Sequence, residues 1–257
     1  YDLAGQRPEP IPVFAEMGSI NPVVLLPEAL SSGAENWAKT YAGSITLGAG
    51  QFCTNPGIAV LIAGEEADKF VAKMKESLSS VPAQTMLTDG IAEAYRKGQQ
   101  RIAAASGVQE VLTSMCDQRS ATPYLYATTA KAWLANESLA EEVFGPLGMV
   151  VIAESLAEML AVAHSLEGQL TCTLHVDQAD MADAKAFMPV LTRKAGRVLA
   201  NAFPTGVEVC DAMVHGGPYP ASTNFGATSV GTMAIRRFLR PVCYQDIPAA
   251  LLPDDLN

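Results

Sequence analysis

The sequence predicts an α/β fold with a mostly parallel sheet, and two observations support this prediction. Short apolar runs alternate along the chain with helical patterns of about 12 to 17 residues, which is typical of β-then-α units. In addition, 49% of the 257 residues are hydrophobic and 17% are charged, so the chain can bury a large core. That core can belong to one large domain or to two small ones.

The first half of the chain contains the clearest β-then-α units. The apolar run after Pro22 predicts a buried strand, and Ser31 or Ser32 is placed to cap the helix that follows. From Glu65 onward the apolar residues recur at helical spacing, with acidic residues in the first turn. The elements expected in this half are a strand at 23–26, a helix at 31–41, a strand at 58–62, a helix at 65–81 and a helix at 89–105.

The second half continues the alternation as far as residue 201 and then changes character. Residues 204–230 are rich in Gly, Pro, Ser and Thr, and a long ordered loop of this kind beside a sheet often carries binding residues. The elements expected in this half are a strand at 147–152, a helix at 155–166, a strand at 170–176, a helix at 178–194, a strand at 196–201, a short helix at 236–239 and a terminal strand at 242–245.

The charge balance and the apolar runs argue against two classes of partner. The 17 basic and 27 acidic residues give a net charge of −10, with no basic cluster longer than Arg236-Arg237, so a nucleic-acid partner is disfavoured. The longest apolar runs are too short to cross a bilayer, and no basic-then-apolar leader opens the chain. We therefore expect an acidic cytoplasmic protein without a membrane partner.

The cysteines and histidines indicate a reducing compartment and no metal site. The five cysteines are odd in number, far apart and never in a Cys-x-x-Cys pair, which argues against a disulfide framework or a thiolate zinc site. His164, His175 and His215 lack the partner spacing of a metal site. We assign no metal, and we expect each histidine to be an ordinary surface or packed residue rather than a catalytic base.

Cys53 is the residue whose setting carries most information about function. It lies in Gly-Gln-Phe-Cys-Thr-Asn-Pro-Gly at residues 50–57, just before the predicted strand at 58–62. Glycines on both sides of a turn that enters a strand can present a thiol to a ligand. The alternative is a buried cysteine that acts as a small hydrophobe.

Three segments together carry a resemblance to a known family. They are Phe-Ala-Glu-Met-Gly-Ser-Ile-Asn-Pro at 14–22, Gly-Gln-Phe-Cys at 50–53 and Glu-Glu-Val-Phe-Gly-Pro at 141–146. In this order and at these separations they resemble the catalytic half of the aldehyde dehydrogenase superfamily, over residues 11 to about 248. The resemblance implies a three-layer α/β/α catalytic domain.

The resemblance also implies a covalent mechanism for the oxidation of an aldehyde. A thiolate adds to the aldehyde to form a thiohemiacetal, from which hydride passes to a nicotinamide, and a carboxylate then activates water to hydrolyse the thioester. Cys53 would be the thiolate and Glu16 the base, although Glu16 can also be read as a solvated carboxylate at a strand end.

Further roles follow from the same resemblance. Glu142 would accept hydrogen bonds from the nicotinamide ribose, Phe144 would pack near the nicotinamide ring, and Phe52 and Phe203 would line the aldehyde tunnel. The cofactor would be NADP or NAD. The Cys53 backbone N–H would hold part of the oxyanion.

The resemblance divides the chain into three parts. Residues 1–17 would be the last strand region of a truncated dinucleotide-binding domain, 18–232 the catalytic thiol domain, and 233–257 a return and oligomerisation segment. We expect the rest of the dinucleotide-binding domain to lie outside this chain. The strand at 242–245 would form a homo-oligomer by pairing at a sheet edge.

One departure from the usual family pattern narrows the substrate. His-Gly-Gly-Pro-Tyr-Pro-Ala-Ser-Thr at 215–223 replaces the usual Gly-Gly-x-Lys-x-Ser-Gly-x-Gly and resembles the NADP-preferring branch that acts on 2-oxoglutarate semialdehyde. Arg197, Ser222 and Thr223 are candidates to hold the carboxylate of such an acidic semialdehyde. Two other functions stay open: a thiol esterase, and a catalytically idle assembly or binding module.

Overall fold

A seven-stranded sheet forms the centre of the computed structural model, which describes residues 1–256. Its strand order is β10-β9-β1-β2-β8-β7-β4, and every neighbouring pair is parallel except β4 with β7. The strands are β1 (Val23–Leu25), β2 (Ile58–Ile62), β4 (Val108–Leu112), β7 (Tyr124–Thr129), β8 (Leu147–Ala153), β9 (Gln169–His175) and β10 (Ala195–Ala200). The predicted α/β class with a mostly parallel sheet is therefore confirmed.

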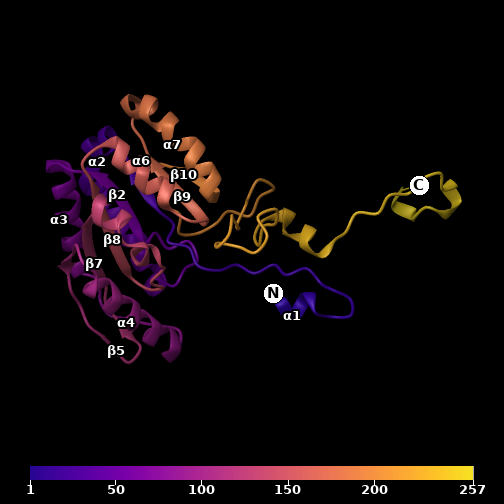
Figure 1. Ribbon diagram of the computed structural model, residues 1–257, viewed down its shortest axis with the longest axis horizontal. Coiled ribbons are helices and arrows are strands. Elements are labelled where there is room, and N and C mark those ends of the chain that lie inside the picture. The colour runs from indigo at the N-terminus through magenta and orange to yellow at the C-terminus, as the bar shows by residue number, and fades with distance from the viewer. Residues whose placement is uncertain (257) are drawn as a thin grey trace.

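Helices cover both faces of this sheet (Figure 1). The α-helices are α1 (Asp2–Gly5), α2 (Pro27–Thr46), α3 (Glu65–Ser79), α4 (Asp89–Ala104), α5 (Ala130–Leu134), α6 (Leu156–Ser165) and α7 (Met181–Lys194). The 3-10 helices are η1 (Leu47–Gly50), η2 (Glu137–Ala140), η3 (Gln178–Asp180), η4 (Thr232–Phe238), η5 (Ala249–Leu251) and η6 (Asp254–Leu256). A second, small antiparallel sheet consists of three strands in the order β3 (Gln84–Thr85), β6 (Ser120–Ala121) and β5 (Cys116–Asp117).

The strands are apolar on both faces, and successive side chains enter two different cores. In β2, Ile58 and Val60 face the core that α4, α5, α6 and α7 cover. Ala59 and Leu61 face the other core, under α2 and α3. Because side chains alternate between the faces of a strand, a continuous apolar run is what a doubly covered strand requires. This arrangement is the predicted three-layer α/β/α architecture.

Buried and exposed polar groups fix where the helices begin. The carboxylate of Asp180 is buried and accepts hydrogen bonds from the N–H groups of Glu28 at 3.0 Å and Ala29 at 2.8 Å, at the first turn of α2. Thr88 caps α4 and Ser155 caps α6 through their side-chain oxygens. These caps satisfy N–H groups that have no partner within the helix.

Several predicted boundaries differ from the structure. The helix predicted at 31–41 is α2, which begins at Pro27 because proline suits a first helical position, and it continues to Thr46. The helix predicted at 178–194 is η3 followed by α7. The sequence prediction assigned no element to the region from β4 to α5. Strands β4, β5 and β6 are short or partly exposed, whereas β7 is a mostly buried strand that the prediction missed.

The two ends of the chain differ most from the prediction. The strand predicted at 242–245 stays a prediction: within residues 1–256 these residues pair with no strand, and the partner predicted for them is another copy of the chain. The helix predicted at 236–239 is part of the 3-10 helix η4. Residues 1–17 contain α1 and one bridge between Glu16 and Ser222.

The C-terminal segment runs away from the α/β body as an arm (Figure 1, yellow). Within residues 1–256, no helix combines the length and apolar composition needed to cross a membrane.

Candidate active site

The three sequence motifs meet at the edge where the parallel strands begin. Residues 14–22 lead into β1, the Cys53 loop leads into β2, and residues 141–146 lead into β8. Strands β1, β2 and β8 are parallel neighbours, so their starts share one edge of the sheet. The motifs are therefore adjacent in space although they are far apart in sequence.

Close backbone contacts build the Cys53 loop. Gly50 has a positive φ of 65°, and a Cβ on it would lie 2.4 Å from the Gly145 carbonyl oxygen, so only glycine fits this contact. The Asn55 side-chain amide also donates to the Gly145 carbonyl, at 3.2 Å. These contacts join the second motif to the third. Cys53 itself is exposed, which supports the presented thiol over the buried alternative.

The side chain of Asn21 holds the Cys53 loop in position by hydrogen bonds to its backbone. This residue is fully buried, and its side-chain amide donates to the carbonyl groups of Cys53 at 2.9 Å and Asn55 at 3.0 Å. Its own side-chain oxygen accepts from the Thr171 hydroxyl and N–H. The sequence prediction gave Asn21 no role, since its partners lie on other segments of the chain.

A third side chain joins the predicted nucleophile and base. The Nε2 atom of His215 lies 3.2 Å from the Cys53 Sγ and 3.2 Å from a Glu16 carboxylate oxygen. Backbone pairing positions these groups, because the Met17 N–H donates to the Ala221 carbonyl at 2.9 Å, beside the Glu16–Ser222 bridge. Cys53 and Glu16 are thus brought together as predicted.

His215 is the functional residue that the sequence prediction missed. We expected an ordinary surface or packed histidine, but the ring is only 5% exposed and contacts both predicted catalytic groups. One feature of the sequence could have indicated a role for His215: it is the first residue of the segment at 215–223 that departs from the usual family pattern.

The electrostatics of this cluster favour a charged ring beside a charged carboxylate. Hydrogen bonds with Cys53 and Glu16 raise the pKa of His215 to about 9, against the opposing effect of burial. The hydrogen bond with His215 is the main cause that lowers the pKa of Glu16, and the Ser229 hydroxyl, at 2.9 Å, lowers it further. Near neutral pH the cluster therefore holds an imidazolium and a carboxylate.

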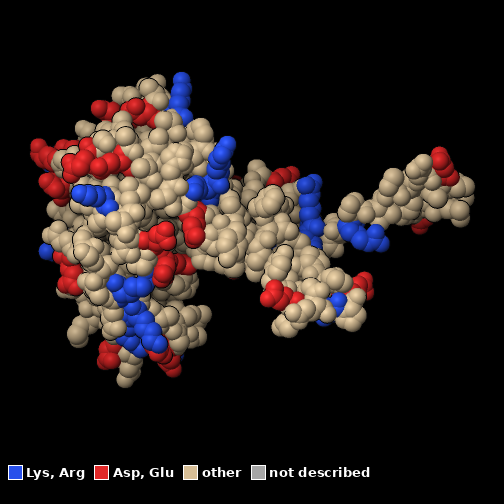
Figure 2. Space-filling view, viewed as in Figure 1, with Lys and Arg blue, Asp and Glu red and all other residues tan. Residues whose placement is uncertain are grey.

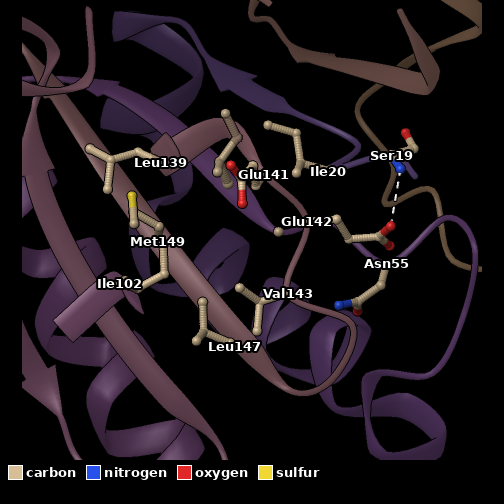
Figure 3. Close-up of a pocket in the computed structure, with 12 residues that line it drawn as sticks. Ser19, Ile20, Asn55, Ile102, Leu139, Glu141, Glu142, Val143, Leu147 and Met149 are labelled. Atoms are coloured by element: carbon tan, nitrogen blue, oxygen red, sulfur yellow. Dashed lines mark hydrogen bonds between the residues drawn. The ribbon is translucent and has the colours of Figure 1, made fainter. Parts of the chain in front are cut away.

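Glu142 lines a pocket together with Ser19, Ile20 and Asn55 (Figure 3). Its carboxylate accepts a hydrogen bond from the Ser19 N–H at 3.2 Å and lies near Asn55. Burial raises the pKa of Glu142 to about 7. The adjacent Glu141 is exposed and pairs with Arg101 at 3.3 Å, so the two neighbouring acids have different environments.

The predicted aromatic residues lie in different settings. Phe52 is 37% exposed beside Cys53, and Phe144 is half-buried. Phe203 packs among the rings of Trp37, Tyr41 and His175, with centroid separations of 6.5, 5.5 and 4.9 Å.

Among the candidates for a substrate carboxylate, Arg197 has the clearest relation to Cys53. Its guanidinium donates to the carbonyl groups of Pro204 at 2.6 Å and Gly206 at 2.9 Å. Burial lowers the pKa of Arg197, and an electrostatic interaction with Cys53 opposes this effect.

The other two candidates are bound to the backbone. The Ser222 hydroxyl donates to the Gly217 carbonyl at 2.6 Å, and the Thr223 hydroxyl donates to the Val13 carbonyl at 2.9 Å.

Comparisons with known proteins find relatives along nearly the whole chain. The model of the Aldehyde dehydrogenase family matches residues 3–240. The chain is 51% identical over 257 residues to alpha-ketoglutaric semialdehyde dehydrogenase 2 of Azospirillum brasilense, which covers 99% of this chain and 49% of that protein. It is 44% identical over 260 residues to alpha-ketoglutaric semialdehyde dehydrogenase of Acinetobacter baylyi, covering 100% of this chain and 49% of that protein.

Solved structures share the fold. Lactaldehyde dehydrogenase from Escherichia coli superposes with a TM-score of 0.71 at 19% identity, over 88% of this chain and 46% of that one. The chain spans about half the length of the curated relatives it matches.

Proposed function

The chain belongs to the aldehyde dehydrogenase family, and we propose that it is the catalytic portion of an oxidoreductase that converts an aldehyde to a carboxylic acid. The observation that carries this proposal is the cluster of Cys53, His215 and Glu16, with 3.2 Å from His215 Nε2 to each of the other two groups. A nucleophile next to a proton acceptor and a carboxylate is the arrangement that covalent catalysis at a carbonyl requires.

Cys53 begins the reaction by adding its sulfur to the aldehyde carbon. The His215 imidazolium, 3.2 Å from the sulfur, can stabilise the attacking thiolate, and the Cys53 N–H is available to the oxyanion of the thiohemiacetal. A bound nicotinamide dinucleotide supplies the acceptor for the hydride that leaves the aldehyde carbon. The product of this oxidation stays on Cys53 as a thioester.

Glu16 then serves in hydrolysis. Its carboxylate accepts a proton from water while the water oxygen adds to the thioester carbon, and the C–S bond breaks to release the acid and the Cys53 thiolate. The lowered pKa of Glu16 keeps the acceptor ionised, and the Ser229 hydroxyl holds it in position at 2.9 Å.

Glu142 fits the hydroxyls of a nicotinamide ribose. A carboxylate can accept several hydrogen bonds, and the Ser19 N–H satisfies one of the positions on Glu142. Burial without a cation raises the pKa of this group to about 7, so hydroxyl donors from a nucleotide would stabilise its charged form. We propose NADP or NAD as the nucleotide, with Phe144 beside the nicotinamide ring.

We further propose that the aldehyde is an acidic semialdehyde, 2-oxoglutarate semialdehyde being the leading candidate. The names of the two curated relatives support this choice. Arg197 supports it independently, because a half-buried guanidinium whose charge interacts with Cys53 can hold a carboxylate near the thiol. Phe52, exposed beside Cys53, would line the path of the aldehyde.

The test uses the natural protein that carries this sequence, supplied with NADP⁺ and 2-oxoglutarate semialdehyde. NADPH formation should occur and should be lost in Cys53→Ala, while the control Cys243→Ala, at another exposed cysteine, keeps it. Full activity in Cys53→Ala would refute the proposal. Replacing Arg197 with Met should raise the KM for the acidic substrate about 10- to 100-fold, the effect of one charge-assisted hydrogen bond, and leave the KM for propanal unchanged.

The contact between His215 and Cys53 also supports a second activity, hydrolysis of activated esters without a nucleotide. An imidazole beside a thiol can promote acylation of Cys53, and Glu16 can promote deacylation. Hydrolysis of p-nitrophenyl acetate by the chain should be lost in Cys53→Ala. In Glu16→Gln the burst of nitrophenol should remain while steady turnover falls; unchanged turnover would remove Glu16 from this role.

The C-terminal arm supports a proposal of homo-oligomer formation. Phe238 is 77% exposed and Leu251 is 72% exposed on a segment that leaves the body (Figure 2). Ile235, Leu239, Val242 and Leu256 are also more than half exposed on this segment, and a run of exposed apolar surface marks a site of protein interaction. We propose that residues 233–257 pack on another copy of the chain, in a cytoplasmic protein.

A further inference from the structure

The geometry of the cluster of Cys53, His215 and Glu16 differs from that of a proton relay. In a nucleophile-histidine-carboxylate relay, one ring nitrogen faces the nucleophile and the other faces the carboxylate. Here a single nitrogen, His215 Nε2, lies 3.2 Å from both the Cys53 sulfur and the Glu16 oxygen. One N–H cannot point fully at both acceptors.

The separations match those of a cation site. All three atoms lie within 4.8 Å of one another. In a tetrahedral zinc site, bonds of about 2.3 Å to sulfur and about 2.0 to 2.1 Å to nitrogen place those two ligands about 3.5 Å apart. The observed 3.2 Å needs an adjustment of a few tenths of an ångström. Thiolate, imidazole and carboxylate are also the ligand types that zinc selects.

The surroundings hold two of these ligands in place and leave the site open. The Ser229 hydroxyl donates to the Glu16 oxygen at 2.9 Å, and the backbone N–H of His215 donates to the Thr228 hydroxyl at 2.8 Å. Such outer contacts orient metal ligands. Cys53 is exposed and the Glu16 side chain is 29% exposed, so an ion can reach the buried ring from solvent.

We propose that Cys53, His215 and Glu16 form a three-ligand site for a thiophilic divalent cation such as Zn²⁺. The ion takes the lone pairs of the sulfur and of the carboxylate that act on the aldehyde, so metal binding and catalysis exclude each other. The fourth position of the ion is left to water, as is usual when a protein supplies three ligands. Binding releases the protons held by the thiol and the ring.

The test is a Zn²⁺ titration of the reduced chain in buffer free of chelators, read by calorimetry and by competition with a chromophoric chelator. One Zn²⁺ should bind per chain. Because loss of an outer contact alone costs about 10- to 100-fold in affinity, Cys53→Ser and His215→Ala should each lose at least ~100-fold, and Ser229→Ala about 10-fold. The controls Cys116→Ser and His164→Ala alter residues outside the cluster and outside the C-terminal arm, and both should bind as the unaltered chain does.

A second measurement needs no variant and no enzymatic activity. Zn²⁺ should protect Cys53 from iodoacetamide while the partly exposed Cys116 keeps its reactivity, as located by peptide mapping. The proposal is overturned if Zn²⁺ does not bind at 100 µM, if folded His215→Ala binds it unchanged, or if Cys53 is alkylated equally with and without Zn²⁺. Because neither measurement uses an aldehyde or a nucleotide, their outcome is separate from that of the proposed oxidation.

Discussion

Replacing Glu142 with Gln is predicted to stabilise the chain above neutral pH. The carboxyl group is buried, and burial raises its pKa from the ordinary 4.5 to about 7. Gln has nearly the same shape and can still accept the hydrogen bond from the Ser19 N–H, but it carries no charge. The substitution therefore removes a buried charge and keeps the contact.

The size and sign of the effect follow from the two pKa values. Between pH 4.5 and about 7 the folded chain holds a proton on Glu142 that the unfolded chain has lost, so the stability of the unaltered chain falls as the pH rises through this window. At about 1.4 kcal/mol for each pH unit between the two pKa values, the cost at pH 8 and above is about 3 kcal/mol. Below pH 4.5 both chains are neutral here and should be equally stable.

Urea unfolding at pH 4.5 and at pH 8 measures this difference. Glu142→Gln should exceed the unaltered chain by about 2 to 3 kcal/mol at pH 8 and match it at pH 4.5. The matched control is Glu141→Gln, whose exposed carboxylate pairs with Arg101 and should change stability by less than about 1 kcal/mol at either pH. An equal effect of Glu142→Gln at both pH values would refute the buried-charge argument.

Three further substitutions test other parts of the structure. His175 is fully buried, neither of its ring nitrogens has a hydrogen-bond partner, and burial lowers its pKa from 6.5 to about 4. The free energy of unfolding should therefore fall by up to about 3 kcal/mol as the pH drops through that window, whereas His175→Phe should not show this loss. Urea unfolding at pH 7 and at pH 4 measures the difference. Asp180→Ala leaves the start of α2 uncapped and should cost about 2 to 4 kcal/mol in urea unfolding, whereas the exposed control Asp183→Ala should cost less than about 1. Asn21→Ala removes the donors to two loop carbonyls and should both lower the melting temperature and change the rate of Cys53 alkylation; an unchanged alkylation rate would deny Asn21 a role in placing the thiol.

The sequence was sufficient for five strands of the central sheet and missed the two adjacent strands β7 and β4. β2 and β8 are continuous apolar runs because both faces are covered, and such runs are visible without any partner. β4 is an antiparallel edge strand with exposed residues and a register shift, which gives no clear periodicity. The strand predicted at 242–245 needs a partner on another copy of the chain, and a sequence pattern alone does not supply that partner.

Some residues of the candidate site could be predicted from the sequence, and one could not. Cys53, Glu16 and Glu142 stand in local motifs that could be read residue by residue. His215 lies 162 residues from Cys53, and its approach depends on the pairing of the segment at 221–223 with the segment at 15–17. A contact of that kind is a property of the folded backbone, so composition and spacing could not predict it.

The most direct test of the central claim is to trap the thioester. The natural protein with Glu16→Gln is mixed with NADP⁺ and 2-oxoglutarate semialdehyde, quenched in acid and mapped by peptide mass spectrometry. The mechanism predicts an acyl group on Cys53 that accumulates in this variant and not in the unaltered protein, because Glu16 no longer activates water. An acyl group on another residue, or none on Cys53, would contradict the assignment of Cys53 as the nucleophile and Glu16 as the base.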